Sequence, residues 1–254
     1  MSGGHAHAGH VPGHSPVHHL PPECKLLATV AFVLVVVSTP RAWYPAYAGY
    51  AALLVAVAVL ASVPLRTVAR RVAVETPFVL FALLLPFVAH GEQVRVLGVA
   101  VSGPGLVAAG TLLAKATLGT VASILLVATT GQRELLRGLE RLRLPPRLVE
   151  IATFMLRYAD VIAAELRRMR IARESRCFSA RSVRGWRVLA HAAGTLFVRC
   201  YERGERVHLA MLARGYTGTM PAASGATAAP SSWARAAVLP VAAGVVLAVT
   251  GLAR

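Results

Sequence analysis

Two tripeptides centred on arginine are the residues of this sequence best suited to recognising another protein. Ala213-Arg214-Gly215 closes one arginine-rich segment, and Ser175-Arg176-Cys177 closes the segment before it. A guanidinium offers a planar fork of donors that fits a carboxylate, and small neighbours let a partner's backbone approach. The simpler interpretation is a helix C-terminus, where glycine follows the last turn and arginine favours the helix dipole. Because the pattern occurs twice, we interpret it as docking.

Histidine is concentrated near the N-terminus, in a tract without regular spacing: His5, His7, His10, His14, His18 and His19. Neutral imidazoles bind nickel, cobalt, zinc and copper. One interpretation is a flexible tail that collects metal. The other is a polar, disordered leader that binds metals only adventitiously.

Lys115 is the one charge in an apolar stretch that runs from residue 96 to residue 132. An ionisable group inside a membrane is costly and usually faces protein or water. Lys115 is therefore either a residue of a permeation or coupling path, or a structural lysine paired with a backbone carbonyl. We favour the structural interpretation.

Catalytic signatures are missing from the sequence. It contains no GxxxxGK[ST] loop, no HExxH and no GxSxG, and its three cysteines are scattered without a CxxC pair. We therefore predict that this chain is not an enzyme and binds no cofactor of its own.

The composition predicts a membrane protein. Hydrophobic residues make up 56% and charged residues only 15%, with 27 Lys+Arg against 11 Asp+Glu and a mean hydropathy of +0.60. A soluble domain carries about 25% charged residues. This balance also excludes a disordered, collagen-like or disulfide-scaffold protein.

Stretches without charge place the spans, since a helix needs about 20 apolar residues to cross a bilayer. We expect about five spans, at residues 26–40, 42–65, 76–91, 106–130 and 236–253. Residues 103–105, Gly-Pro-Gly, predict a turn, and the alternating residues 95–99 before it predict a short extended external piece.

Basic residues near the span ends predict the orientation. Arg66, Arg70 and Arg71 lie between the second and third spans, whereas the flanking loops hold only Arg41 and Arg95. The N-terminus is therefore expected in the cytoplasm, and the C-terminus outside. No signal peptide is evident.

Residues 133–216 hold most of the arginines, interspersed with acidic residues, and predict two long amphipathic helices. The first apolar stripe contains Leu148, Ile151, Met155, Tyr158, Ile162, Leu166 and Met169. The second contains Leu189, Ala193, Leu196, Cys200, Val207 and Met211. Such helices must pack on each other, on the membrane part or on a partner.

The expected fold is therefore an all-α integral membrane protein with about five transmembrane helices and long cytoplasmic amphipathic coupling helices. The predicted divisions are a His-rich tail (1–24), four transmembrane helices (25–130), the cytoplasmic coupling-helix region (131–216), a Gly/Pro/Ser/Ala linker (217–234) and a C-terminal transmembrane helix (235–254).

The segment from Arg199 to Gly218, RCYERGERVHLAMLARGYTG, resembles the cytoplasmic signature of the transmembrane T component of energy-coupling-factor (ECF) transporters, most closely the cobalt/nickel (CbiQ) branch. The segments LPPRLV at 144–149, LRY at 156–158, Thr129-Thr130 and LPPECKL at 20–26 are also similar to this family. The resemblance covers nearly all of residues 20–218, and is specific at the Ala-Arg-Gly block.

The resemblance implies a scaffold in the inner membrane of a prokaryotic cell. In that family two Ala-Arg-Gly motifs dock into grooves on two ATP-binding-cassette (ABC) ATPase subunits, which bind ATP and Mg²⁺, and the scaffold transmits their closure to a substrate-binding S component. Carried over, the second motif is intact at Ala213, Arg214 and Gly215. The first keeps only its arginine, in Ser175-Arg176-Cys177, and cysteine disfavours the positive φ that glycine allows. The implied cargo is Co²⁺ or Ni²⁺.

Two alternatives stay open. The same scaffold can serve a vitamin substrate. A membrane-tethered arginine-rich binder of nucleic acid or anionic lipid is disfavoured, because acidic residues interrupt the basic surface and no pure Lys/Arg stripe with stacking aromatics is present. We expect lipid bilayer contact and no nucleic-acid partner.

Overall fold

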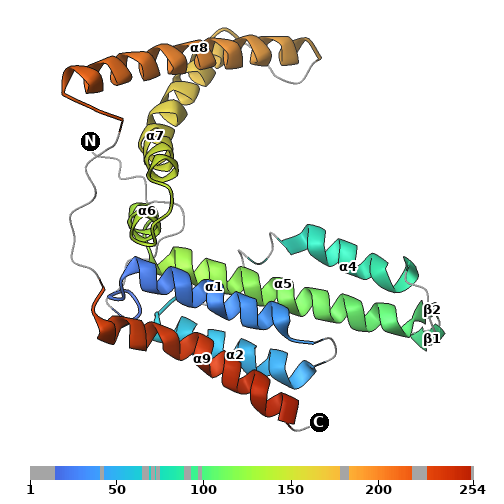
Figure 1. Ribbon diagram of the computed structural model, residues 1–254. Coiled ribbons are helices and arrows are strands. Elements are labelled where there is room, and N and C mark those ends of the chain that lie inside the picture. Colours follow the sequence, from blue (N-terminus) through green and yellow to red (C-terminus); the bar gives the residue numbers. More distant parts are fainter. Residues whose placement is uncertain are drawn as a thin grey trace. The chain divides into compact units, whose positions relative to one another are not determined.

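Helices account for nearly all of the regular structure that the computed structural model describes (Figure 1). The described residues are 15–40, 43–64, 69, 72, 75–88, 93–96, 99–177, 183–218 and 228–252. The chain divides into a first unit, Met1–Arg141 with Ala226–Arg254, and a second unit, Leu142–Gly225. The short helix that follows α5 belongs to the first unit, and the predicted division between membrane helices and coupling region at residue 130 stays a prediction.

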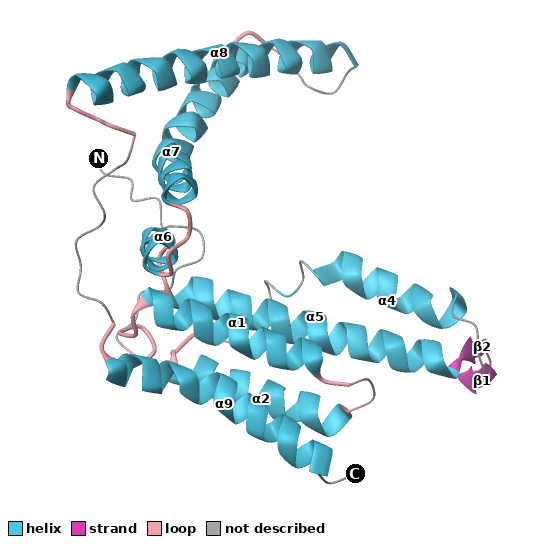
Figure 2. Cartoon of the chain, in the orientation of Figure 1, coloured by secondary structure: helices cyan, strands magenta, loops and turns pink. Residues whose placement is uncertain are grey.

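The first unit contains a set of apolar helices, one short polar helix and a hairpin. These are α1 (Pro22–Ser38), α2 (Tyr44–Leu60), α4 (Thr76–Val88), β1 (Gln93–Val96), β2 (Val99–Ser102), α5 (Gly103–Thr129), α6 (Gln132–Arg141) and α9 (Pro230–Leu252). In Figure 2 the antiparallel hairpin lies where α4 ends and α5 begins, with Gln93 opposite Ser102. The extended conformation predicted for residues 95–99 is confirmed at residues 95, 96 and 99, while residues 97–98 lie outside the described residues.

The turn expected at residues 103–105 is wrong, because α5 already begins at Gly103. The Ser102 hydroxyl accepts a hydrogen bond from the Gly105 backbone N–H at 3.3 Å and so caps the helix. Proline is tolerated in the first turn of a helix, where its missing N–H would have no partner anyway. For the same reason α9 begins at Pro230, inside the segment predicted as linker.

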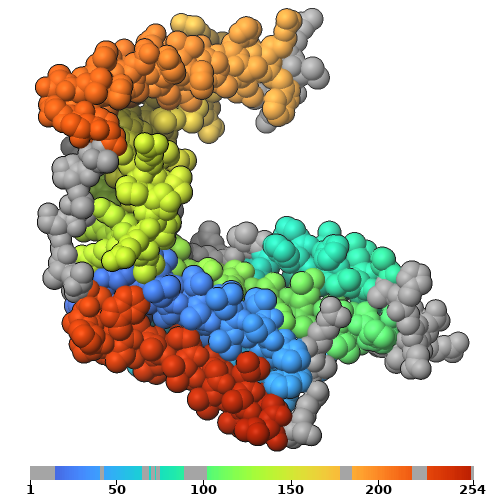
Figure 3. Space-filling model, viewed as in Figure 1, coloured from blue at the N-terminus to red at the C-terminus, as the bar shows by residue number. Residues whose placement is uncertain are grey.

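Helices α1, α2, α5 and α9 pack around a shared apolar core. Figure 3 shows the side chains of α9 lying against those of α1. Phe32 on α1 and Tyr50 on α2 are fully buried and meet edge to face with ring centroids 6.1 Å apart. The Tyr50 hydroxyl is hydrogen-bonded to the Thr39 hydroxyl at 3.0 Å, which satisfies the one polar atom that this ring brings inside.

The outer faces of the helices in the first unit remain apolar, as expected for the membrane protein that the composition predicts. Exposed examples are Val59, Phe87, Val88 and Val238. Within the described residues, α5 and α9 are long and apolar enough to cross a membrane, whereas α2 and α4 are apolar but shorter. The larger number of about five spans stays a prediction.

The second unit consists of two long helices, α7 (Pro146–Glu174) and α8 (Val183–Ala213). The two long amphipathic helices predicted for this region are confirmed. Most of the second predicted stripe is partly buried, and so are Tyr158, Ile162 and Met169 of the first. The other members of the first stripe remain exposed: Leu148, Ile151, Met155 and Leu166.

Candidate functional site

The second arginine motif forms the C-terminal end of α8. Gly215 has φ +82°, and its N–H donates to the carbonyl of Leu212 at 3.0 Å. The Tyr216 N–H reaches back to the carbonyl of Met211 at 3.0 Å. This pair of bonds is the Schellman ending of a helix, and its left-handed residue is the position that glycine suits. The ending places Arg214 at the tip of the helix with its side chain exposed.

The first motif gives α7 the same kind of ending in spite of its different sequence. Cys177 has φ +56°, and its N–H donates to the carbonyl of Glu174 at 3.0 Å. This matches the bond that Gly215 makes to Leu212, so Arg176 precedes a left-handed residue just as Arg214 does. Cys177 therefore adopts the same backbone conformation that glycine has in the second motif. Because cysteine carries a side chain, this left-handed conformation is strained.

Removing this strain gives a direct prediction. We expect Cys177→Gly to stabilise the end of α7 by about 1 kcal/mol, since a side chain in the left-handed region costs about 1–2 kcal/mol. Hydrogen exchange of the last-turn amides, including that of Cys177, should slow by about fivefold. Cys200→Gly is the matched control: it puts glycine inside α8 and should destabilise by about 1 kcal/mol. Faster exchange in Cys177→Gly would contradict the assigned strain.

Both motif guanidiniums are available to a partner. Within the described part of the chain, neither Arg176 nor Arg214 takes part in an ion pair, whereas Arg168, Arg170 and Arg199 each do. Arg176 and Arg214 are exposed. An exposed fork that has no ion-pair partner among the described residues suits a bidentate bond to a carboxylate of another protein.

A tyrosine ties the tip of α8 to the beginning of α7. The Tyr216 hydroxyl donates to Glu150 Oε1 at 2.5 Å, and the His208 ring meets the tyrosine ring edge to face at 6.5 Å. The bond to the carboxylate raises the pKa of Tyr216 above its ordinary value of 10.0. The contact restrains the residues that follow Arg214. Sequence reasoning did not assign this role to Glu150.

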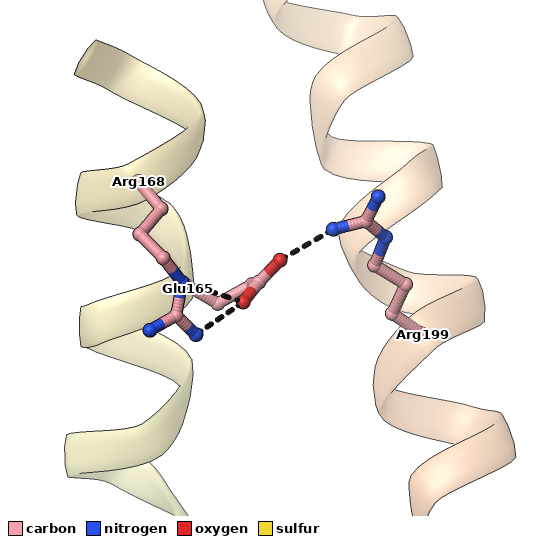
Figure 4. Close-up of polar contacts among 3 residues, drawn as sticks. All are labelled: Glu165, Arg168 and Arg199. Atoms are coloured by element: carbon pink, nitrogen blue, oxygen red, sulfur yellow. Dashed lines mark hydrogen bonds and ion pairs between the residues drawn. The ribbon is translucent and has the colours of Figure 1, made fainter. Parts of the chain in front are cut away.

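A cluster of three charged residues joins the two helices where they cross (Figure 4). Arg168 donates to Glu165 Oε2 through Nε at 3.1 Å and through Nη2 at 2.5 Å. From α8, Arg199 Nη1 donates to the other carboxylate oxygen, Oε1. These bonds hold the pKa of Glu165 below its ordinary value of 4.5. The cluster fixes α7 against α8, and therefore the positions of their two arginine tips relative to each other.

The charge cluster predicts how the crossing responds to mutation and to pH. We expect Glu165→Gln to broaden the distance distribution between spin labels on α7 and α8, because Arg199 loses its ionic acceptor. The pKa of Glu165 is lowered, so the contact is fully present above the ordinary value of 4.5 and weakens as pH falls below it.

Glu174→Gln is the matched control, because among the described residues the Glu174 carboxylate bonds within its own helix, to Arg170 Nε at 2.7 Å. The control should leave the distribution unchanged. An equal broadening in both variants would show that Glu165 does not hold the crossing.

Large apolar side chains remain exposed on both helices of the second unit. Examples are Ile151 and Met155 on α7 and Phe197, Tyr201 and Leu209 on α8, each at least 56% exposed. A broad apolar surface beside arginine tips is typical of a surface that binds another protein. The packing of α7 against α8 therefore buries only part of the apolar side chains that the sequence predicts to be covered.

Lys115 lies on α5, and its ammonium donates to the carbonyls of Val37 at 2.6 Å and Thr39 at 2.8 Å. These carbonyls end α1, where backbone acceptors lack a helical partner. Lys25 on α1 makes the reciprocal contact, to the Thr129 carbonyl at 3.0 Å at the end of α5. This arrangement favours the structural role for Lys115. Lys25 was not recognised from the sequence, because it lies beside the first apolar run.

The histidine tract lies mostly outside the described residues, which include neither His5, His7, His10 nor His14. His18 is described, and its Nδ1 is hydrogen-bonded to the Ser15 hydroxyl at 2.7 Å. Within the part of the chain that the structure describes, no group of three or more His, Cys, Asp or Glu side chains is placed to hold a metal ion. Metal collection by the tail stays a prediction.

Comparison with known families identifies the class of protein that combines a set of apolar helices with two long helices ending in arginine motifs. A family model described as a cobalt transport protein, CbiQ, matches residues 13–223. The chain belongs to the CbiQ family. The membership predicted from the Ala-Arg-Gly block is thus confirmed.

Two of the similar proteins cover most of the chain, and a third matches a shorter part of it. The cobalt transport protein CbiQ of Rhodobacter capsulatus is 31% identical over 201 residues, 77% of this chain and 78% of that protein. The energy-coupling factor transporter transmembrane protein EcfT of Thermanaerovibrio acidaminovorans is 31% identical over 224 residues, 82% of each protein. A match of 34% over 110 residues to an uncharacterized protein of Methanocaldococcus jannaschii covers 41% of that protein. The chain is therefore a transporter membrane component.

Proposed function

We propose that this chain is the energy-coupling scaffold of an ECF-type ABC importer, which links two ATPase subunits to a substrate-binding membrane subunit. The observation that carries the proposal is the pair of like helix ends. Arg176 and Arg214 each end a long amphipathic helix, each precedes a left-handed residue, and each is exposed. One such tip for each of two ATPase subunits is what the scaffold requires.

In this mechanism ATP and Mg²⁺ bind the partner ATPases, and this chain contributes positioning. Its two arginines enter grooves on the ATPases and pair with carboxylates there. The Glu165 cluster and the contact between Tyr216 and Glu150 keep the tips at a set separation, so closure of the ATPases moves the two helices as a pair. The exposed apolar surface of α7 and α8 then offers contact to the substrate-binding subunit.

For the substrate we propose Co²⁺ or Ni²⁺, carried as cargo and not held by this chain as a cofactor. The name of the Rhodobacter relative and the N-terminal histidines support a metal substrate. The names of the EcfT relatives specify no substrate, so the alternative of a vitamin substrate stays open. We further propose a multi-pass protein of the prokaryotic inner membrane with a cytoplasmic N-terminus, on the charge distribution around its apolar stretches.

The test is reconstitution of the chain with its ATPases and substrate-binding subunit in proteoliposomes. ATP-dependent accumulation of radioactive cobalt or nickel, absent without this chain, is the expected result. Uptake of a vitamin in place of the metals would correct the substrate and keep the scaffold role. The proposed function would be overturned if the ATPases bound the substrate-binding subunit and supported uptake equally well when this chain was left out.

A further inference from the structure

A cavity of about 300 Å³ lies within the first unit, among four of its helices. Its wall is formed by the N-terminal parts of α1 and α9 and the C-terminal parts of α2 and α5, which meet at one end of the bundle (Figure 1). The lining is mostly aliphatic and includes Leu54, Leu125 and Leu239. Its size is at the lower end of the range for small-molecule sites, about 300–1,000 Å³.

The hydroxyls on this wall already have partners. Thr29 donates to the Lys25 carbonyl at 2.8 Å, and Thr129 donates to the Leu125 carbonyl at 2.8 Å. The Lys25 ammonium uses its three protons on the His18 carbonyl, the Thr129 carbonyl and the Thr130 hydroxyl. The interior of the cavity therefore suits an apolar occupant.

Charge distinguishes one end of the cavity. Lys25 and Arg235 are its charged lining residues, and no acidic side chain is among them. Lys25 is only 6% exposed, and within the described residues neither cation has an ion-pair partner. Arg235 donates through Nε to the Ser231 carbonyl at 3.2 Å, and the described residues offer its two Nη groups no hydrogen-bond partner. The carboxylate of Glu134 acts on Lys25 as a counter-charge, so Arg235, with its two Nη groups open, is the cation that favours the approach of an anion.

We propose that this cavity binds one anionic phospholipid, part of whose acyl chain enters the aliphatic interior and whose phosphate bonds to Arg235. A guanidinium fork matches phosphate oxygens, and an apolar space between membrane helices is filled most readily by a lipid tail. The bilayer is the source of this ligand, so the inference is independent of which substrate the transporter carries. The lipid would fill the space between α9 and the other three helices and stabilise their packing.

The experiment is native mass spectrometry of the delipidated chain in detergent, titrated with dioleoylphosphatidylglycerol or with dioleoylphosphatidylcholine. The two lipids have the same acyl chains and differ in net charge. We expect one phosphatidylglycerol to bind, at least about tenfold more tightly than phosphatidylcholine. Arg235→Gln should remove this preference, whereas Arg157→Gln, the same change on an exposed residue of α7, should keep it.

The acyl chain is tested by filling the cavity. Leu239→Trp places an indole in it and should abolish phosphatidylglycerol binding, whereas Val241→Trp, on the exposed face of the same helix, should not. Equal binding of both lipids, with no effect of Arg235→Gln, would overturn the proposal. Competition by inorganic phosphate at millimolar concentration would also overturn the proposal, because it would show that the site binds a phosphate group without needing the acyl chain of a lipid. Arg235 is exposed, so its variant tests the idea whatever Leu239→Trp does to folding.

Discussion

Replacing Arg214 with alanine is expected to abolish co-purification of the ATPases and substrate uptake. The side chain ends α8, is exposed, and has no ion-pair partner in the described part of the chain, so we expect its loss to leave the fold of this chain intact. Losing one partner of a desolvated arginine–carboxylate pair costs about 2–5 kcal/mol. The affinity for the ATPase should fall by at least about 30-fold, which a pull-down at micromolar protein resolves.

Arg187→Ala is the matched control, because it removes an exposed arginine from the other end of the same helix. It should leave assembly intact. Arg176→Ala should impair assembly less than Arg214→Ala, because Arg176 belongs to the motif that departs from Ala-Arg-Gly. Full ATPase binding and uptake by Arg214→Ala would rule out docking through this residue, and the fold would need another contact to transmit closure.

The sequence was sufficient to predict the two long amphipathic helices and the residues at their tips. Both depend on local information: apolar side chains at helical spacing, and an arginine between small residues where the spacing stops. Cys177 marks the limit of such reasoning. Cysteine alone predicts a poor fit to a left-handed position, yet the helix ending imposes that conformation on it.

Contacts between distant residues could not be predicted in this way. Glu165 and Arg199 are 34 positions apart, and Lys115 and Val37 are 78 apart. Charged residues are frequent on α7 and α8, and nothing local distinguishes Glu165 from Glu174, whose described side-chain bond lies within its own helix. The crossing of the two helices determines which charged side chains meet. The apolar stripes do not determine that crossing, because the same stripes can pack in more than one way.

Helix α6 meets α1 in a tight contact that positions a partly buried ion pair. A Cβ on Gly138 would lie 3.0 Å from the Glu23 backbone nitrogen, so the helices approach this closely only because the residue is glycine. Arg141 Nη1 then donates to Glu23 Oε1 at 2.9 Å. Glu23 is 3% exposed, and its second oxygen has no hydrogen-bond partner in the structure. Because α6 is the last helix of the first unit before the chain enters α7, we expect this contact to matter for coupling if the proposed function holds.

Arg141→Met is therefore expected to destabilise the first unit by about 3 kcal/mol, because it leaves a buried carboxylate without a cation. This value is at the lower end of the range for buried pairs, since 31% of the Arg141 side chain is exposed. Thermal unfolding in detergent measures the loss. The double variant Glu23→Gln/Arg141→Met should recover most of it, because the buried charge is then gone.

A matched control and a functional measurement separate an effect of this contact on coupling from a general loss of stability. Arg206→Met breaks an exposed pair with Glu202, 3.8 Å apart, and should change stability by less than about 1 kcal/mol. At a temperature where Arg141→Met remains folded, we expect the ATPases still to co-purify while uptake falls, because the arginine tips are untouched and the connection to the membrane helices is loosened. Normal uptake under these conditions would show that closure reaches the membrane helices by another route.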